Sequence, residues 1–546
     1  MKILNISVAC LFFLSCTTLK KVDLLVYNTK VYTVDASFSV AEAMAVNKGK
    51  IEATGSTAQL TKKYKGKQKI DANGKFIYPG FIDAHAHFLS YGLSLQTADL
   101  VDTKSWNEVL QRLTQFKQQK SLQPGQWLTG RGWDQNDWTV KEFPDKHRLD
   151  ELFPENPVLL TRIDGHAAIA NSKAFQLSNI TAPKKITGGE IEAKNNQPTG
   201  ILIDNAIGLV SSNIPRPDKA TLTNALLDAQ RNCFTAGLTT IDDCGVNAST
   251  VDLVKELQNN NQLKMRLYLM LSDNPANYDY LESKGIIKTN KLHVRGFKLY
   301  GDGALGSRGA CLLRPYSDKP GSYGFLLSSP AHFDSTAARI YKNGFQMCTH
   351  AIGDSGNRVI LKTYAKYLKG KNDLRWRIEH AQVVNEKDFK LFGQYNIIPS
   401  VQPTHATSDM YWAGERLGNQ REKGAYAYKQ LMLENLWMPL GTDFPVENIS
   451  PFKTFYAAVF RQDAKEFPAG GYQMENALSR QDALRGMTIW AAKSNFEEAE
   501  KGSLQKGKLA DFIILDKDLM AVPKSEILNA KVLMTFLNGE KVFEQK

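Results

Sequence analysis

The middle of the chain repeats a pattern of a short apolar run, a loop and a longer stretch with helical spacing of its apolar positions. Eight such runs occupy residues 76–87, 237–245, 264–273, 294–303, 345–354, 376–382, 397–403 and 438–445. Amphipathic stretches between them, such as 219–236 and 355–368, predict helices. Continuously apolar strands that alternate with helices are typical of a parallel sheet covered on both faces. Eight such units predict an α/β fold built on a closed (β/α)₈ TIM barrel.

The two ends of the chain show a different pattern, in which β-branched and aromatic residues alternate with polar ones. Within residues 22–76 these runs are separated by Asn-Thr, Asn-Lys-Gly and Asn-Gly, which predict hairpin turns. Residues 500–546 return to the same pattern. We therefore predict one β-sandwich domain assembled from 22–76 and 500–546, and a barrel domain over 77–499.

A long insertion, roughly residues 88–220, separates the first barrel strand from the second. A connection of this length is normally a functional element or a subdomain of its own. We interpret it as an α/β insertion that forms a lid over the barrel mouth. Its segment "GWDQNDW" hints at a hydrophobic or ring-bearing substrate group, although Trp133 and Trp138 are equally suited to packing the insertion.

The first sixteen residues form a separate unit with a basic start, an apolar stretch from Ile3 to Leu14 and a small residue before Cys16. The stretch is shorter than the ~20 residues of a membrane-spanning helix and has the length of an export signal. "FLSC" followed by "TTLKK" resembles the lipobox of bacterial lipoproteins. This resemblance implies a signal peptide over 1–16, a lipid on Cys16 and a place in the bacterial cell envelope, at the periplasmic or outer-membrane face. An ordinary cleaved signal and a buried N-terminal helix are the alternatives.

Charge and cysteine content narrow the function classes. The chain of 546 residues has a net charge of +12, but basic and acidic residues are mixed, and the densest basic run at 61–69 has no recognition motif beside it. We expect a solvated loop there and no nucleic-acid partner.

The cysteines beyond the first sixteen residues show no CxxC spacing, and we expect buried thiols at Cys233, Cys244, Cys311 and Cys348. A Cys233–Cys244 disulfide stays open as an alternative in an oxidising compartment.

Six side chains with metal-binding capacity stand at the ends of the apolar runs. They are His85, His87, Lys298, His350, His380 and Asp443. His85 and His87 are two residues apart on one strand, so both imidazoles point to the same face. Four imidazoles and one carboxylate suit Zn²⁺ or a neighbouring transition metal better than Ca²⁺ or Mg²⁺. Because active sites of this fold lie at the carboxyl ends of the strands, we predict a metal site there.

The predicted site supports a definite chemistry. Water bound to such a metal loses a proton near neutral pH, and the resulting hydroxide attacks a carbonyl carbon. Asp443 can act as the general base that passes this proton to the leaving group. Lys298 cannot bind a metal as an ammonium, but addition of CO₂ to its buried amine would give a carbamate that bridges two ions. An ion-paired structural lysine is the alternative.

Several motifs together resemble those of a known family. They are "PGFIDAHAH", "KLYGDGALGSR", "HAIGD", "RIEHAQ", "GTDFPV" and the closing "KGSLQKGKLADFIILD". From about residue 23 to 546 the chain resembles the amidohydrolase superfamily, and within it the amidohydrolase-3 group, which includes N-substituted formamide deformylases and YtcJ-like proteins. This resemblance implies a zinc site with one or two ions and Lys298 as the N6-carboxylated bridge.

The same resemblance points to further residues near the pocket. Asp164 and His166 in "TRIDGH" and His405 in "QPTH" are candidates for substrate binding or for stabilising a developing oxyanion. Loop residues that merely shape the mouth are the alternative. Asp302 and Arg308 are weaker candidates.

We therefore expect a metal-dependent hydrolase of non-peptide C–N bonds, acting on an amide or N-formyl amine. A lactonase or esterase with the same site is one alternative. A non-catalytic, surface-anchored binding or regulatory protein is the other, although a complete ligand set argues against it. The expected partners are a small amide-like substrate, the membrane through the lipid anchor, and a second copy of the chain in a homo-oligomer.

Overall fold

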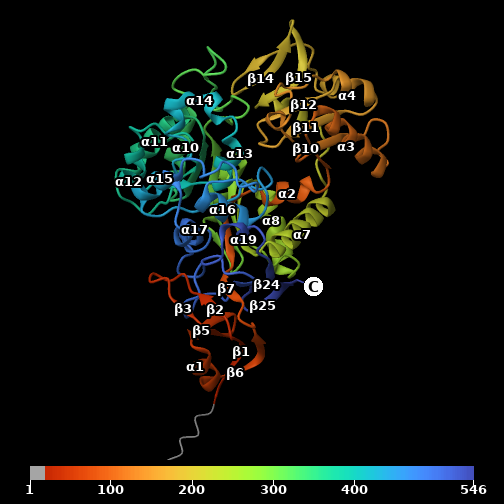
Figure 1. The fold of residues 1–546 in the computed structure, drawn as a ribbon. Coiled ribbons are helices and arrows are strands. Elements are labelled where there is room, and N and C mark those ends of the chain that lie inside the picture. The colour runs from red at the N-terminus through yellow and green to blue at the C-terminus, as the bar shows by residue number, and fades with distance from the viewer. Residues whose placement is uncertain (1–18, 546) are drawn as a thin grey trace, which may run out of the picture.

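The computed structural model describes residues 19–545 and arranges their strands in four sheets (Figure 1). An eight-stranded sheet lies in the middle of the chain, a seven-stranded sheet lies in the insertion, and two sheets contain strands from the chain ends. In Figure 1 the insertion sheet lies at one end of the molecule and β1 and β6 lie at the other, with the barrel between them.

The central sheet is a parallel barrel. Its strands pair in the order β8 (Phe81–Ala86), β16 (Leu238–Val246), β17 (Arg266–Ser272), β19 (Leu292–Tyr300), β20 (Gln346–Ala351), β21 (Arg377–His380) and β22 (Ile398–Ser400), with β18 (Ile287–Lys288) antiparallel on β19. Val401 forms an isolated parallel bridge with Leu440, and the Ala84 amide donates to the Leu440 carbonyl at 3.3 Å. The segment 438–445 therefore closes the ring between β22 and β8. The predicted TIM-barrel fold is confirmed.

Helices follow the barrel strands and pack their apolar faces against them. They are α7 (Lys219–Thr235), α8 (Ala248–Asn259), α9 (Pro275–Lys284), α10 (Pro330–Lys342), α11 (Asp354–Leu368), α12 (Phe389–Tyr395), α15 (Tyr428–Asn435) and α17 (Arg480–Gly486). Helix α7 begins after Asp218, whose side chain accepts a hydrogen bond from the Thr221 amide. Leu226 of α7 and Leu361 of α11 belong to the same buried core as Leu269 of β17. The helices predicted over 219–236 and 355–368 are present as α7 and α11.

The helices that remain, apart from the four described below with the insertion sheet, lie beside the barrel, in the insertion or among the strands of the chain ends. They are α1 (Thr57–Lys63), α2 (Phe88–Ser94), α13 (Pro403–Asp409), α14 (Ala413–Glu422), α16 (Pro451–Phe460), α18 (Ile489–Ser494), α19 (Lys524–Ile527) and the 3₁₀ turns η1 (Gln135–Asp137) and η2 (Met474–Asn476). Among the described residues, no helix has the length and apolar character needed to cross a membrane.

Strands from both ends of the chain meet in one sheet. Its order is β25 (Glu540–Glu544), β24 (Val532–Leu537), β23 (Phe512–Leu515), β7 (Phe76–Pro79), β2 (Lys30–Tyr32) and β3 (Val40–Ala41). The other sheet has the order β5 (Lys50–Gly55), β4 (Ala43–Asn47), β1 (Lys20–Tyr27) and β6 (Tyr64–Asp71). Leu24 and Met44 of the second sheet share a core with Phe512 and Phe536 of the first. The exact domain limits stay a prediction.

The insertion has its own sheet and its own core. The strands pair in the order β13 (Lys185–Ile186), β14 (Gly189–Lys194), β15 (Gln197–Asp204), β12 (Ala167–Ala170), β11 (Val158–Arg162), β10 (Leu128–Trp133) and β9 (Ala98–Asp99). Its helices are α3 (Trp106–Gln119), α4 (His147–Leu152), α5 (Ser172–Leu177) and α6 (Ile207–Ser211). Trp133 and Trp138 are buried in this core and donate to the carbonyls of Leu160 and Thr103. They pack the insertion and do not line the cavity described below.

The four described cysteines are all free thiols. Cys233, Cys244 and Cys348 are buried as expected, whereas Cys311 is half-buried. Since Cys233 and Cys244 are both free, the alternative of a disulfide between them is not realised. The predicted signal peptide over 1–16 and its Cys16 lie outside the described residues.

Candidate metal centre and active-site cavity

The side chains predicted to bind metal come together at the carboxyl ends of the barrel strands. His85 and His350 are the next-to-last residues of β8 and β20, Lys298 lies two residues before the end of β19, and His380 is the last residue of β21. His87 directly follows β8, and Asp443 lies in the segment that closes the barrel. Five of the six side chains are buried, and His87 is half-buried: the buried ones are His85, Lys298, His350, His380 and Asp443.

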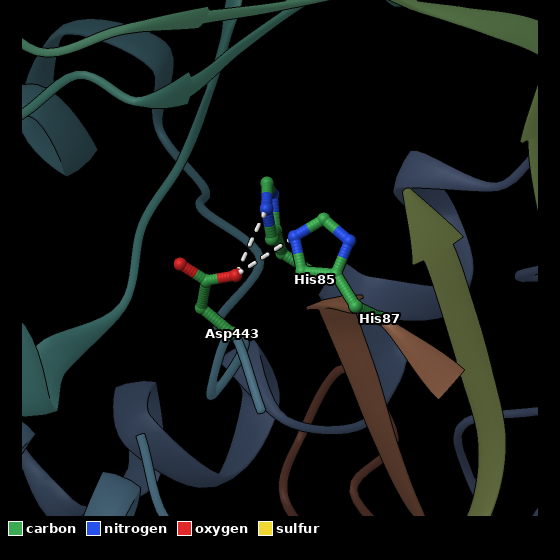
Figure 2. Close-up of side chains that lie close together, drawn as sticks. All are labelled: His85, His87 and Asp443. Carbon is green, nitrogen blue, oxygen red and sulfur yellow. Dashed lines mark ion pairs between the residues drawn. The ribbon is translucent and has the colours of Figure 1, made fainter. Parts of the chain in front are cut away.

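Asp443 contacts both histidines of the first strand through one oxygen. Its Oδ1 lies 3.2 Å from Nε2 of His87 and 3.5 Å from Nε2 of His85 (Figure 2). The three donor atoms all lie within 4.8 Å of one another, close enough to hold one ion. Oδ1 of Asp443 is buried and has no hydrogen-bond donor in the described structure. A buried carboxylate oxygen without a partner is unfavourable, so a cation fits this position.

The other carboxylate oxygen of Asp443 faces a second group. Oδ2 lies 3.2 Å from Nε2 of His405, and donor atoms of His380, His405 and Asp443 also lie within 4.8 Å of one another. The centre of the His380 ring lies 4.7 Å from the centre of the His85 ring and 4.6 Å from that of the His350 ring. Nδ1 of His380 is buried and has no hydrogen-bond partner among the described residues. The two groups share Asp443 and form one continuous donor set.

The protonation states favour metal binding. Burial, followed by the positive charge of Lys298, lowers the pKa of His85 to about 4. Burial also lowers the pKa of His350 and of His380 well below the usual range. Burial raises the pKa of Asp443, but the histidines around it outweigh this effect and hold the pKa well below its usual value. Neutral imidazoles and an ionised carboxylate are the forms that bind metal.

Lys298 lies inside this set of donors. Its Nζ is 3.3 Å from Nε2 of His85 and 4.8 Å from the centre of the Tyr300 ring. Burial lowers the pKa of the amine, but the surrounding groups, Tyr300 first among them, outweigh burial and raise it. The amine therefore lies among the candidate metal ligands.

Backbone strain accompanies two of the candidate ligands. His380 has φ 72° and Asp443 has φ 64°, in the left-handed region that non-glycine residues rarely adopt. Such conformations cost about 1–2 kcal/mol each and persist where surrounding contacts enforce them. Next to Asp443, the carboxylate of Asp83 accepts hydrogen bonds from the Thr442 amide at 2.9 Å and from its hydroxyl at 2.7 Å. These bonds fix the segment that carries Asp443.

Glu379 is a site residue that the sequence analysis missed. Its Oε2 lies 2.6 Å from Nδ1 of His85, and both side chains are fully buried. Burial raises the pKa of this carboxyl, but the electrostatic interaction with the His85 imidazole and the hydrogen bond from it outweigh burial and hold the pKa below its usual value. The signal was an acidic residue inside the apolar strand "RIEH", because an acid is rarely buried there without a partner.

A cavity of about 1400 Å³ opens over the donor set. Residues of the barrel and of the insertion share its wall, and His87, Lys298, His350, His380 and Asp443 lie at its barrel side. The insertion contributes charged and titratable side chains, among them Arg131, Asp134, Arg162, Asp164, His166 and Asp204. The cavity is large and polar enough for a small substrate with several polar groups.

The three predicted substrate contacts all line this cavity. Asp164 is already engaged, since it bonds Arg162 at 2.6 Å and accepts from the His166 amide at 3.0 Å. The ring of His166 lies 5.0 Å from that of His350. His405 lies between Asp443 and Glu447, whose Oε1 is 3.3 Å from its Nδ1.

The two weaker candidates occupy different positions. Asp302 is fully buried and accepts hydrogen bonds from the amides of Cys311, Ile352 and Gly353, which makes it an anchor for the loops after β19 and β20. Arg308 pairs with Asp318 at 2.9 Å and does not line the cavity.

Comparison with known proteins agrees with this geometry. A model of the amidohydrolase family matches residues 68–543. Protein LONG AFTER FAR-RED 3 of Arabidopsis thaliana is 33% identical over 95% of this chain and 91% of its own length. Putative amidohydrolase YtcJ of Bacillus subtilis (strain 168) is 30% identical over 94% of this chain and 98% of its own length. N-substituted formamide deformylase of Arthrobacter pascens is 26% identical over 96% of this chain and 98% of its own length.

A solved structure extends the likeness to three dimensions. An uncharacterized metal-dependent hydrolase from Pyrococcus horikoshii OT3 is 27% identical and superposes with a TM-score of 0.74. The match covers 92% of this chain and 99% of the other. The chain belongs to the amidohydrolase family and is a hydrolase that acts on carbon–nitrogen bonds other than peptide bonds.

Proposed function

We propose that the chain hydrolyses an amide or an N-formyl amine at a zinc centre of one or two ions. The observation that carries this proposal is the contact of one buried Asp443 oxygen with His85 and His87 (Figure 2). The residues that would hold the metal are His85, His87, His350, His380 and Asp443. The name of the Arthrobacter pascens relative, a formamide deformylase, supports the choice of substrate.

The bound metal would supply Lewis acidity that polarises the substrate carbonyl and lowers the pKa of a water to about 7. Asp443 would take the proton of this water; its position at the cavity wall and its lowered pKa support this role. As the water oxygen bonds to the carbonyl carbon, the C–N bond breaks and Asp443 passes the proton to the departing nitrogen. The products are a carboxylic acid and an amine.

Lys298 would bridge two ions after its amine has added CO₂. The proposal is supported by the burial of Lys298 and by the 3.3 Å between its Nζ and Nε2 of His85. A carbamate offers two oxygens of the kind that a carboxylate ligand offers. An unmodified, ion-paired lysine is the alternative that metal analysis distinguishes.

We further propose that the insertion acts as a lid that selects the substrate. Arg131 of the insertion donates to the carbonyl of Pro445 at 2.5 Å and to that of Ile163 at 2.6 Å. Pro445 follows Asp443 by two residues, so this guanidinium ties the insertion to the candidate ligand segment. Substrate choice would then depend on side chains of the insertion that line the cavity.

The test is a panel of N-formyl and N-acyl amines, lactones and esters, assayed with zinc-loaded protein. We expect turnover of the amides, with N-formyl amines among the better substrates. Turnover of lactones or esters alone would favour an esterase with the same site. Absence of any turnover by a metal-loaded, folded protein would favour a binding or regulatory protein.

We also propose that Cys16 carries a lipid that anchors the protein in the bacterial cell envelope. The proposal rests on the sequence "FLSC" followed by "TTLKK". Labelling with a fatty-acid probe and membrane fractionation test it, with Cys16→Ala as the control. Labelling that persists in this variant, or a protein that fractionates without membranes, would contradict it.

A further inference from the structure

A half-buried histidine and a buried aspartate of the insertion form a pair beside the candidate metal ligands. Nδ1 of His166 lies 2.5 Å from Oδ1 of Asp204. The side chain of Asp204 is 1% exposed and that of His166 is 15% exposed. His166 directly precedes β12 and Asp204 is the last residue of β15, its antiparallel neighbour, and the Asp204 amide donates to the His166 carbonyl at 2.9 Å. The strand pairing therefore fixes their separation.

The carboxylate of Asp204 is seated against two glycines of the loop that follows Lys298. A Cβ atom added at Gly303 would lie 2.6 Å from Oδ2 of Asp204, and one added at Gly309 would lie 2.4 Å from the same atom. Both distances are far below contact, so a side chain at either glycine would displace the carboxylate. The loop from β19 of the barrel thus provides a space shaped for Asp204 of the insertion.

The pair has a defined orientation toward the cavity. Because Asp204 occupies Nδ1, Nε2 is the ring nitrogen of His166 that is left for another partner. His166 lines the cavity, and its ring lies 5.0 Å from that of His350. A carboxylate bonded to one ring nitrogen fixes the tautomer and the direction of the other, as in carboxylate–histidine pairs of many active sites.

We propose that Asp204 is a positioning residue that holds His166 so that its Nε2 hydrogen-bonds the substrate beside the metal ligands. The proposal deepens the proposed hydrolytic function and rests on it. Asp204 acts through His166 and does not touch the substrate itself. The insertion would then complete the active site as well as cover it, and the glycine loop after Lys298 would set the position of the pair.

A double-mutant cycle tests the coupling. We expect Asp204→Ala and His166→Ala each to lower kcat by about 10²-fold with a much smaller change in KM, because a misplaced group loses contacts that matter in the transition state. The double variant should be no slower than His166→Ala, since the two residues act as a unit. Asp204→Asn, which keeps the shape and an acceptor oxygen, should retain more activity than Asp204→Ala. Additive losses, or Asp204→Ala with wild-type kcat, would overturn the proposal.

Replacing a glycine of the loop after β19 narrows the space for the Asp204 carboxylate while His166 and Asp204 themselves stay unchanged. Gly309→Ala should lower kcat as Asp204→Ala does, because the new Cβ meets Oδ2 of Asp204 first. Gly208→Ala in the insertion is the matched control, since a Cβ there meets nothing within 4 Å. Equal activity of Gly309→Ala and Gly208→Ala would show that the space beside Gly309 does not position Asp204.

A spectroscopic measurement tests the pair independently of turnover. In protein labelled with ¹⁵N-histidine, the short Nδ1–H···O bond should give a far-downfield proton signal. The His85–Glu379 bond should give a second signal of this kind. The His166 signal is therefore the one that is lost in His166→Ala and Asp204→Ala while the other persists, and the metal content of both variants should equal that of the wild type. A wild type without the signal refutes the pair. A wild type that shows it but hydrolyses no amide refutes the proposed function instead.

Discussion

The carboxylate of Glu379 accepts a hydrogen bond from Nδ1 of His85 at 2.6 Å inside the barrel. This bond places the lone pair of Nε2 toward Asp443 and Lys298, where the candidate metal ligands meet. A histidine ligand oriented by a buried carboxylate is the usual arrangement around protein-bound metals.

Replacing Glu379 therefore should weaken metal binding. We expect Glu379→Gln to lower metal affinity by about 10- to 100-fold, because the amide holds the imidazole less firmly and removes a negative charge. Competition with a chromophoric chelator measures the affinity. Glu386→Gln is the control, since Glu386 is exposed. Identical affinities for the two variants would show that the Glu379–His85 bond does not support the metal.

Removing the first two histidines should remove metal without unfolding the barrel. The double variant His85→Ala/His87→Ala should bind no stoichiometric metal and show no turnover, while its circular dichroism spectrum in chelator matches that of the wild type. His147→Ala is the control, because this histidine is exposed and pairs only with Glu151 in the described structure. Metal analysis and activity of the purified variants decide the matter. Retained turnover would refute the site.

The bridging role of Lys298 predicts a chemical rescue. Lys298→Ala should lose the second ion and most activity, and a small carboxylic acid such as acetate or propionate should restore part of both. Lys298→Met should lose activity without rescue, because its side chain fills the space that the acid would enter. Full metal content and rate in Lys298→Ala would mean that the lysine is structural.

The floor of the barrel is held by a charge pair that has no part in the proposed reaction. Nη1 of Arg377 lies 2.9 Å from Oδ2 of Asp242, and both side chains are fully buried. Arg377→Met leaves Asp242 without its cation, and we expect a loss of about 3–5 kcal/mol in unfolding free energy. Urea denaturation in chelator measures the loss. Lys219→Met breaks an exposed pair with Glu256 and should cost less than about 1 kcal/mol. Comparable losses of unfolding free energy in the two variants would contradict the expectation that the buried pair contributes more to stability than the exposed one.

The sequence predicts the barrel because its strands are buried on both faces and appear as continuous apolar runs. The eighth run is the partial exception. Residues 438–445 close the ring through an isolated bridge at Leu440, and the chain leaves the extended conformation at Asp443, where φ is 64°. The histidine spacing in the first run predicts a shared face, and the structure places both rings beside Asp443.

Contacts between distant residues were beyond the sequence. Glu379 and His85 are separated by 294 positions, so no local spacing connects them. The seat of Asp204 on Gly309 depends on how the insertion docks against the loop after β19, which no periodicity records. The aromatic segment of the insertion did not indicate which residues line the cavity, since Trp133 and Trp138 pack inside the core of the insertion.

The most direct test of the metal centre is an anomalous difference map from crystals of the zinc-loaded protein, collected on both sides of the zinc absorption edge. We expect a zinc peak within bonding distance of His85, His87 and Asp443, with a second peak near His350 and His380 if two ions bind. Zinc peaks confined to other parts of the molecule, or no peak in an active crystal, would contradict it.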